Sequence, residues 1–408
     1  MSKTCIIIGA SHAAAQLAPS LRQEGWEGRI LVIGDEPYVP YHRPPLSKAF
    51  LSGEKDADGI LIRPQAVYEK NDIEFKLGVR VETINRAHKN ITLTNGEVLS
   101  YDKLALCTGS RVRTVSLPGV DLAGVHYLRN IADVEKIKGD VAEGKNAVIV
   151  GGGYIGLETA AVLKKLGMNV TVLEMAPRVL ARVTAPEMSE FFTRVHTDEG
   201  VSIKTGVAVS GFEGDNGRVC RVACADGTGF DADLVVVGVG IVPNVELAEA
   251  AGLAVENGIV VDELCRTADP DIVAAGDCTN HPSAIYDTRL RLESVPNASE
   301  QGKTSAATIC GKEKPYNALP WFWSDQYDLK LQIAGLSQGY DQVIIRGDRE
   351  GSRSFVAFYL KEGKLIAADC MNRPQEFMVC KRLIAEGTPI DPAKLADESV
   401  APKEFLNG

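Results

Sequence analysis

Two stretches of the chain share one pattern of apolar and polar positions. In each, a short apolar run is followed by small residues, a helical segment rich in Ala and Leu, and a second apolar run that ends in an acid. The first copy runs from residues 3–8 to Asp35, and the second runs from residues 147–150 to Glu174. Short apolar runs between turn residues are typical of buried parallel strands. The pattern therefore predicts two strand–helix–strand units.

The second unit carries the GxGxxG spacing directly after its first strand. We expect Gly151 to make the tight turn, Gly153 to let the backbone approach a pyrophosphate, and Gly156 to let the helix over 157–166 pack on the strand. Glu174 ends the second strand, where an acid can bind the hydroxyls of a ribose. Strand, turn, helix, strand and acid together indicate a dinucleotide site rather than a purely structural glycine turn.

The first unit is a variant of the same motif. Gly9 holds the first position, but Ser11 and Ala14 replace the second and third glycines. Ala14 is a tolerated variant for close packing, whereas Ser11 is a departure that weakens the local prediction. The helix over 13–22 ends near a glycine, and Asp35 again follows the second strand. Two interpretations remain open: two working sites, or one site and one decayed copy.

A second similarity suggests that the whole unit is repeated. Strands predicted over 73–84 and 90–94 lead to an apolar strand that ends in Thr108-Gly109, and residues 234–244 repeat this form. Such repetition indicates two similar domains, the second inserted in the first. A further buried strand ends in Gly276-Asp277, where a carboxylate can bind a sugar-like hydroxyl.

The remaining segments complete an α/β chain with a small third part. Residues 38–48 form a loop that should not be helical through Pro44-Pro45, and its cations Arg43 and Lys48 suggest a cofactor contact. A helix is expected over 294–310. A small α+β part over 321–408 is predicted from strands at 329–335, 343–346, 354–360 and 364–369, and a helix near 374–386.

Length and composition narrow the function classes. The 408 residues allow about two or three domains. No apolar run approaches the ~18 residues of a membrane span, and the start of the chain has no signal-peptide layout. A net charge of −10 disfavours nucleic acid as a partner. Nine scattered cysteines without a CxxC suit reduced thiols in a cytoplasmic protein, with no zinc or other metal site.

Several motifs together resemble the putidaredoxin reductase type of FAD-dependent NADH:ferredoxin reductases, which serve bacterial oxygenase and cytochrome P450 systems. The segments that carry the resemblance are 9–14, 44–48, 107–109, 151–158, 276–277, 293–298 and 320–326. The resemblance covers nearly the whole chain. It implies a glutathione reductase-like architecture in which the first unit binds FAD and the second binds NADH. It also implies a [2Fe–2S] ferredoxin partner that feeds a cytochrome P450 or a Rieske-type oxygenase.

The same resemblance implies domain limits and site residues. The domains are 1–113 with 243–320 for FAD, 114–242 for NADH, and 321–408 at the C-terminus. Lys48 and Glu158 should pair beside the flavin, where Lys48 stabilises negative charge and Glu158 orients Lys48 and the nicotinamide carboxamide. Asp277 should hold the ribitol chain and Asp35 the adenosine ribose. The cofactor-binding residues are Gly9, Ser11, Ala13, Ala14, Asp35, Arg43, Lys48, Val81, Thr108, Gly109, Arg129, Gly276, Asp277 and Val295 in the FAD part, and Gly151, Gly153, Ile155, Gly156 and Glu174 in the NADH part.

Competing functions differ in their need for cysteine. A flavin disulfide reductase, peroxidase or NADH oxidase of the same fold that works by thiol chemistry needs a cysteine pair or a single reactive cysteine near the flavin. Residues 35–60 contain none, and Cys5 and Cys107 lie in predicted buried strands. Two alternatives stay open: a flavin NADH oxidase or plain diaphorase, and a redox-sensing NADH-binding interaction protein similar to apoptosis-inducing factor.

The sequence leaves alternatives for the coenzyme preference and for the residues that contact the ferredoxin. Glu174 favours NADH, although Arg178 and Arg182 leave a dual-specific site open. Trp321 and Trp323 are either core aromatics or part of an electron exit. The resemblance does not fix the cations that meet the ferredoxin, and the candidates are Arg289, Arg291, Lys330, Arg373, Lys381 and Arg382. We expect a monomer or a weak homodimer.

Overall fold

The computed structural model describes residues 3–407, and the chain forms two compact units. The first unit comprises residues 1–42, 57–111 and 241–320. The second comprises residues 43–56, 112–240 and 321–408. Residues 1, 2 and 408, at the outer limits of the predicted domains, lie outside the described part.

The first unit is built on a five-stranded sheet of order β19-β7-β1-β2-β3, in which every pair of neighbours is parallel. Buried apolar side chains on both faces explain why the strands read as continuous apolar runs. The strands are β1 (Thr4–Ile8), β2 (Arg29–Ile33), β3 (Ile73–Lys76), β7 (Lys103–Leu106) and β19 (Ile272–Ala274).

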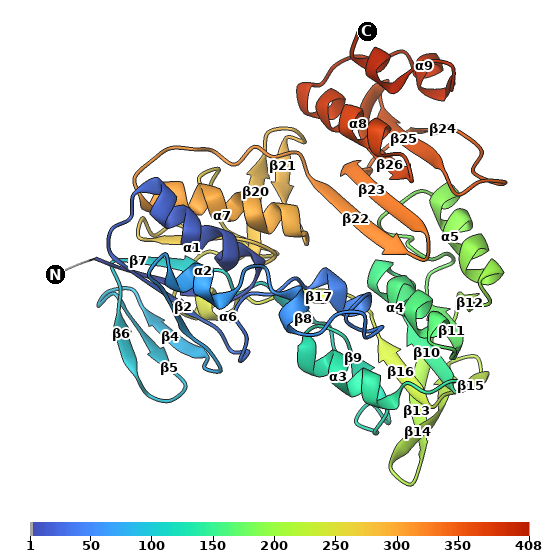
Figure 1. Cartoon of the computed structure of the whole chain (residues 1–408), viewed down its shortest axis with the longest axis horizontal. Helices are drawn as coiled ribbons and strands as arrows, with labels where there is room; N and C mark the ends of the chain where they lie inside the picture. Colours follow the sequence, from blue (N-terminus) through green and yellow to red (C-terminus); the bar gives the residue numbers. More distant parts are fainter. Residues whose placement is uncertain (1–2, 408) are drawn as a thin grey trace. The chain divides into compact units, whose positions relative to one another are not determined.

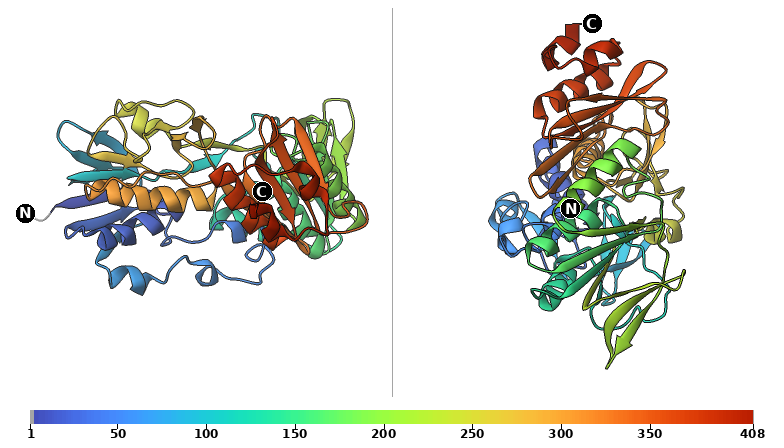
Figure 2. Two further views of the ribbon diagram at one scale, coloured as in Figure 1. Left: turned by 90° about the horizontal axis from the view of Figure 1, so that it is seen from above. Right: turned by 90° about the vertical axis from the view of Figure 1, so that its right-hand side faces the viewer.

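Helices α1 (His12–Glu24) and α7 (Val295–Ile309) pack against each other in the first unit. They lie side by side in blue and orange (Figure 1, Figure 2). Their approach is close, because a Cβ on Gly302 would lie 2.9 Å from the carbonyl oxygen of Ala13. The unit also contains α2 (Gln65–Glu69), α6 (Glu246–Ala250), a sheet of β4 (Val81–Asn85), β5 (Asn90–Leu93) and β6 (Val98–Ser100), and a sheet of β18 (Ile259–Val260), β20 (Thr279–Ser283) and β21 (Thr288–Leu290).

The second unit repeats the order of the first. Its parallel sheet runs β12-β11-β10-β16-β9, so that β10, β11, β12 and β16 correspond to β1, β2, β3 and β7. In each unit a three-stranded meander precedes the returning strand. The elements are β9 (Val125–Tyr127), α3 (Ile131–Asp140), β10 (Asn146–Val150), α4 (Tyr154–Lys165), β11 (Asn169–Glu174), α5 (Pro186–Asp198), β12 (Ser202–Thr205), β13 (Val209–Asp215), β14 (Arg218–Cys224), β15 (Gly229–Asp231) and β16 (Leu234–Val237).

The last part of the chain also belongs to the second unit. It forms a five-stranded antiparallel sheet of order β22-β23-β26-β25-β24, with α8 packed on β23 and β26. This sheet is drawn in orange to red (Figure 1). Its elements are β22 (Trp321–Gln326), β23 (Leu329–Gly335), β24 (Gln342–Arg346), β25 (Phe355–Lys361), β26 (Lys364–Met371), α8 (Pro374–Glu386), α9 (Pro392–Ala396) and a 3-10 turn over Pro402–Asn407.

Two local predictions were wrong. The predicted strand over 73–84 is two strands, because Gly78 adopts a left-handed φ of 70° between β3 and β4. The loop through Pro44-Pro45 does contain a helical turn, a 3-10 helix over Pro44–Ser47. Proline is tolerated in the first turn of a helix, since the N–H groups there need no intrahelical acceptor. A second 3-10 turn covers Asp58–Ile60, and the short strands β8 (Ser110–Val112) and β17 (Ile241–Pro243) lie where the chain passes between units.

The two-unit division differs from the predicted domains in two respects. Residues 43–56 belong to the second unit, and residues 321–408 are not separated from 112–240. The assignment of FAD and NADH to particular domains stays a prediction. Among residues 3–407, no helix is long and apolar enough to cross a membrane.

Candidate functional site

The carboxyl ends of the parallel strands gather the predicted residues of the first unit at one edge of its sheet. Gly9 follows β1, Asp35 follows β2, Thr108 follows β7, and Gly276 follows β19. This edge is where open α/β sheets bind ligands, because the helices that follow the strands begin there.

The turn after β1 explains the glycine variants of the first unit. Gly9 has a φ of 106°, and a Cβ there would lie 2.1 Å from the carbonyl oxygen of Cys107. Only glycine fits this position. Ser11 caps α1 with an extended backbone, φ −131° and ψ −154°, which any residue adopts. Ala13 and Ala14 are buried in the first turn of α1. The replacement of the second glycine by Ser11 is therefore compatible with the motif's backbone.

Hydrogen bonds hold the polar residues of this edge in place. The Ser110 hydroxyl donates to Asp277 Oδ2 at 2.8 Å. The hydroxyl of Thr108, which precedes Gly109 at φ 61°, donates to the backbone oxygen of Asn244 at 2.7 Å. The Gly276 N–H donates to Gln301 Oε1 at 2.7 Å. These contacts fix the strand ends that would face a ligand.

Three further residues of the first unit lie near the strand and helix ends. Asp35 is exposed and forms an ion pair with Arg80 at 2.9 Å, and such an exposed pair adds little to stability. Val81 is buried at the start of β4, and Val295 begins α7 after the cap Ser294. The structure thus leaves the Asp35 carboxylate accessible for a ribose.

In the second unit, the three glycines differ in what surrounds them. A Cβ on Gly151, whose φ is 113°, would lie 2.3 Å from the carbonyl oxygen of Gly238. A Cβ on Gly156 would lie 2.2 Å from the carbonyl oxygen of Gly151. Gly153 has nothing within 4 Å of the corresponding position. The first and third glycines are thus required by packing, and the space over the second suits a pyrophosphate at the start of α4.

Glu174 lies at the end of β11, and its carboxylate is anchored on the glycine loop. Its two oxygens accept the N–H groups of Gly152 and Ala176, each at 2.7 Å. Each oxygen has a second lone pair for a ribose hydroxyl. Arg178 is occupied, since it donates to the Ser189 hydroxyl at 2.6 Å and to the Ala181 carbonyl at 3.0 Å, whereas Arg182 is exposed.

Lys48 and Glu158 form an ion pair within the second unit. Lys48 Nζ lies 2.6 Å from Glu158 Oε2, and the two side chains are 20% and 4% exposed. Lys48 follows the 3-10 turn, and its Nζ also donates to the Pro44 carbonyl at 3.3 Å. Lys48 thus has a fixed place despite its flexible stem.

The sequence did not assign roles to the residues that surround this pair. The hydroxyls of Ser47 and Ser324 donate to the two Glu158 oxygens, each at 2.6 Å. Ser324 in turn accepts from Gln326 Nε2 at 3.1 Å, and His196 Nε2 lies 2.7 Å from Gln326 Oε1. Polar residues at the alternate positions 324 and 326 of a strand are the sequence signal for Ser324 and Gln326, and no such signal marks Ser47 or His196.

Arg43 and Arg129, which the sequence assigned to FAD binding, lie in the second unit, as does Ile155. An Arg43 guanidinium nitrogen, Nη1, donates to the backbone oxygen of Arg129 at 2.8 Å, just after β9. Ile155 is 47% exposed in the first turn of α4, an unusual position for a large apolar side chain. Within residues 3–407, no group of three or more His, Cys, Asp and Glu side chains is arranged to hold a metal ion.

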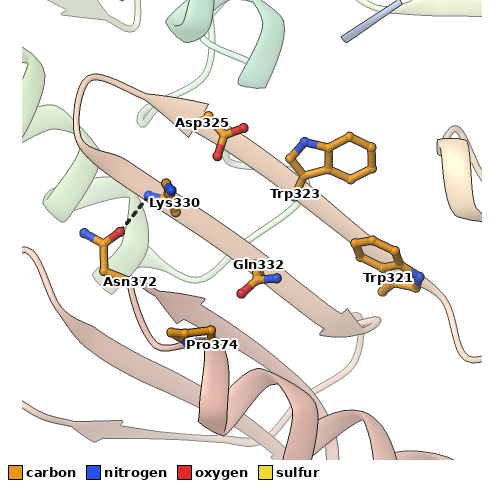
Figure 3. A pocket seen from close by; sticks show the side chains of 7 residues that line it. All are labelled: Trp321, Trp323, Asp325, Lys330, Gln332, Asn372 and Pro374. Carbon is orange, nitrogen blue, oxygen red and sulfur yellow. Dashed lines mark hydrogen bonds between the residues drawn. The ribbon is translucent and has the colours of Figure 1, made fainter. Parts of the chain in front are cut away.

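A cavity of about 430 Å³ lies on the C-terminal sheet of the same unit. Its walls are side chains of β22, β23 and the start of α8 (Figure 3). The Trp321 and Trp323 rings lie 5.6 Å apart, and Lys381 Nζ lies 5.0 Å from the centre of the Trp321 ring. The lining residues are Trp321, Trp323, Asp325, Lys330, Gln332, Asn372 and Pro374. The two tryptophans are therefore half-buried beside a cavity rather than core residues.

The two cysteines in the predicted buried strands do not suit thiol chemistry. Cys5 and Cys107 are buried, as predicted, and burial raises the pKa of both thiols well above the ordinary value. A thiol with a raised pKa is a poor nucleophile at neutral pH.

Comparison with known proteins decides the family. Residues 3–302 match the pyridine nucleotide-disulphide oxidoreductases, and residues 321–406 match the reductase C-terminal family. The chain is 44% identical over 406 residues to putidaredoxin reductase from Pseudomonas putida, covering 98% of this chain and 96% of that one. This chain belongs to the ferredoxin reductases of the putidaredoxin reductase type.

Further relatives and solved structures agree with this membership. The ferredoxin–NAD(+) reductase component of the anthranilate 1,2-dioxygenase system of Burkholderia cepacia is 40% identical over 404 residues, covering 98% of each chain. The reductase in the covalent putidaredoxin reductase–putidaredoxin complex is 44% identical, with a TM-score of 0.96 over 99% of this chain and 98% of that one. A ferredoxin reductase from Rhodopseudomonas palustris gives a TM-score of 0.95 at 42% identity, covering 98% and 99%.

These comparisons confirm the predicted family and the α/β fold class with its C-terminal domain. They also confirm that the enzyme is a flavoprotein oxidoreductase of the FAD- and NAD(H)-using class. The individual site residues stay predictions.

Proposed function

We propose that this reductase takes electrons from NADH through FAD and passes them to a [2Fe–2S] ferredoxin, which feeds a cytochrome P450 or a Rieske-type oxygenase. The observation that carries the proposal is the ion pair of Lys48 with the buried Glu158, on the helix that follows a glycine loop with room for a pyrophosphate. The solved relative in complex with putidaredoxin supports a ferredoxin partner. A cytoplasmic location, a monomer or weak homodimer, and the absence of nucleic-acid or membrane partners are parts of the same proposal.

The two sheet edges fit the two cofactors. In the first unit, Gly9, Ser11 and Ala13 would hold the FAD pyrophosphate, Asp35 the adenosine ribose, and Asp277 the ribitol. In the second, Gly153 would lie against the NADH pyrophosphate and Glu174 would bind the ribose. FAD, when bound, accepts a hydride from NADH and releases its electrons singly, which is the conversion that a one-electron iron–sulfur acceptor requires.

The chain's own contribution to hydride transfer is placement and charge. The Lys48 ammonium would stabilise the negative charge that develops during reduction. Glu158 would hold Lys48 through Oε2 and orient the carboxamide of the nicotinamide. No side chain needs to give or take a proton in the hydride step.

The cavity beside Trp321 and Trp323 is the proposed contact for the ferredoxin. Two of the candidate cations, Lys330 and Lys381, lie beside it. The others have structural partners: Arg373 binds Glu398, Arg382 binds Glu386, Arg289 binds Asn280, and Arg291 binds Glu293. Lys330 and Lys381 are therefore the stronger candidates.

The decisive experiment separates a reductase from a diaphorase or a sensor. The protein is loaded with FAD, and cytochrome c reduction by NADH is measured with and without a [2Fe–2S] ferredoxin. Fast reduction only with ferredoxin supports the proposal, and equal rates favour a diaphorase or a sensor. Lys48→Met should slow flavin reduction by about 10²–10³-fold in stopped flow. An unchanged rate would remove Lys48 from the mechanism.

A further inference from the structure

A chain of hydrogen bonds runs from Glu158 to the turn after β22, entirely within the second unit. Ser324 Oγ lies 2.6 Å from Glu158 Oε1, and Gln326 Nε2 lies 3.1 Å from Ser324 Oγ. His196 Nε2 lies 2.7 Å from Gln326 Oε1. Tyr327 completes the chain, with its hydroxyl 3.2 Å from His196 Nδ1.

The chemistry of these groups fixes which partner donates in each hydrogen bond of this network. A carboxylate only accepts, so the Ser324 hydroxyl donates to Glu158 and must itself accept from the Gln326 amide. The amide oxygen of Gln326 then accepts from His196 Nε2–H. His196 Nδ1 is left to accept from the Tyr327 hydroxyl, which requires the neutral Nε2–H tautomer. Burial lowers the pKa of His196 and so favours this neutral form.

Burial makes each hydrogen bond of this network costly to break. Ser324, Gln326 and His196 are 1%, 2% and 0% exposed. In such an environment each bond polarises the next, and a missing partner leaves a polar group without water. Ser324 and Gln326 reach this position because alternate residues of β22 face one side, while Trp321, Trp323 and Asp325 line the cavity on the other.

The hydrogen-bond network also controls the orientation of the Glu158 carboxylate. Lys48 and Ser47 both bind Glu158 Oε2, and Ser324 is bonded to Oε1. Without Ser324 only the Oε2 side of the carboxylate is held, so the carboxylate plane can turn about its last bond and shift the Lys48 ammonium bound to Oε2. A shift of about 1 Å in a catalytic group is enough to cost a large factor in rate.

We propose that Ser324, Gln326 and His196 are positioning residues that hold the Glu158 carboxylate, and through it Lys48, in the orientation required for hydride transfer. This inference rests on the proposed function of the Lys48–Glu158 pair. It assigns a role to residues of α5 and β22 that make no direct contact with Lys48 in the network.

The first test compares variants of the FAD-loaded protein in stopped flow. Ser324→Ala and Gln326→Leu should each slow flavin reduction by NADH about tenfold, with little change in the affinity for NADH. Ser324→Thr, which keeps the hydroxyl, should restore most of the rate. The matched control is Tyr359→Phe, which removes a buried hydroxyl bonded to Asp369 in the same unit, outside the chain that ends on Glu158. Its rate should equal that of the wild type.

The second test needs no turnover. In protein labelled with ¹⁵N-histidine, the His196 nitrogen shifts should report the Nε2–H tautomer in the wild type. Glu158→Gln should change these shifts, although residue 158 is not in contact with His196. An amide can donate as well as accept, so it no longer fixes which partner donates in each hydrogen bond from Ser324 to His196. Unchanged His196 shifts would overturn the inference, as would rates in Ser324→Ala and Gln326→Leu equal to that of Tyr359→Phe. If Lys48→Met and Glu158→Gln also keep the wild-type rate, the proposed role of the ion pair fails instead.

Discussion

Replacing Gly151 by Ala tests how the second nucleotide unit is built. The new Cβ would lie 2.3 Å from the carbonyl oxygen of Gly238, well inside the 3.0 Å that real Cβ atoms respect. The backbone at φ 113° also disfavours any side chain. Overpacking costs about 1–3 kcal/mol and the backbone conformation about 1–3 kcal/mol. We therefore expect Gly151→Ala to lower the free energy of unfolding by roughly 2–6 kcal/mol.

The matched control is Gly153→Ser, only two residues away. Its φ of −81° suits any residue, nothing lies within 4 Å of its Cβ position, and Ser11 stands at the equivalent place in the first unit. Serine is also a favoured helix cap. This variant should unfold within about 0.5 kcal/mol of the wild type, the range usual for harmless substitutions.

Thermal unfolding of the FAD-loaded protein measures both variants. At about 2–4 °C per kcal/mol, Gly151→Ala should lower the Tm by roughly 4–24 °C. NADH titration should show loss of coenzyme binding in Gly151→Ala. A Gly151→Ala variant as stable as the wild type, or a Gly153→Ser variant destabilised as much as Gly151→Ala, would refute the assignment of the tight turn to the first glycine.

Three more outcomes are expected. The kcat/KM for NADH should exceed that for NADPH by at least about tenfold, and Glu174→Ala should reduce this preference by weakening NADH binding. Equal kcat/KM values for the two coenzymes in the wild type would remove Glu174 from the ribose site. Burial raises the pKa of Asp369 to about 6, so the folded state binds more protons than the unfolded state between about pH 4 and 6. As the pH rises through this window, the wild type should lose up to roughly 3 kcal/mol of stability relative to Asp369→Asn. Urea midpoints of the two proteins that differ by the same amount at pH 4 and at pH 7 would contradict this. Ferredoxin reduction should slow as the salt concentration rises towards about 0.1 M. Lys381→Gln should weaken this salt dependence, whereas Arg382→Gln should not, because the Arg382 guanidinium already binds Glu386. A salt-independent rate would indicate apolar docking.

The sequence predicted those parts of the site that depend on local pattern. Gly9, Asp35, Gly151 and Glu174 follow apolar strands, and parallel pairing alone brings such positions to one edge of a sheet. The same logic predicted the repeat of the two units.

The sequence could not predict contacts between distant segments. Nothing local to Glu158 indicates that its carboxylate accepts from Ser47 and Ser324, which are 111 and 166 residues away. A serine and a glutamine in a strand are also compatible with an exposed face. No local feature of the sequence indicates a role for His196, and only the fold shows its burial and its contact with Gln326. The helical turn at Pro44 was missed because the rule against proline in helices applies to their interior.

The hairpin of β22 and β23 has a consequence for how this protein tolerates insertions. Gln326 pairs with Leu329, so only Tyr327 and Asp328 form the turn, and Tyr327 adopts a left-handed φ of 53°. One extra residue before Trp323 in β22 would move every following side chain of the strand to the opposite face. The indole of Trp323 would then point at Glu158, and the Ser324 hydroxyl would open onto the cavity. Point substitutions in β22 can alter one face at a time, but a single-codon insertion or deletion would exchange the two, and we expect natural length variation to fall outside this strand.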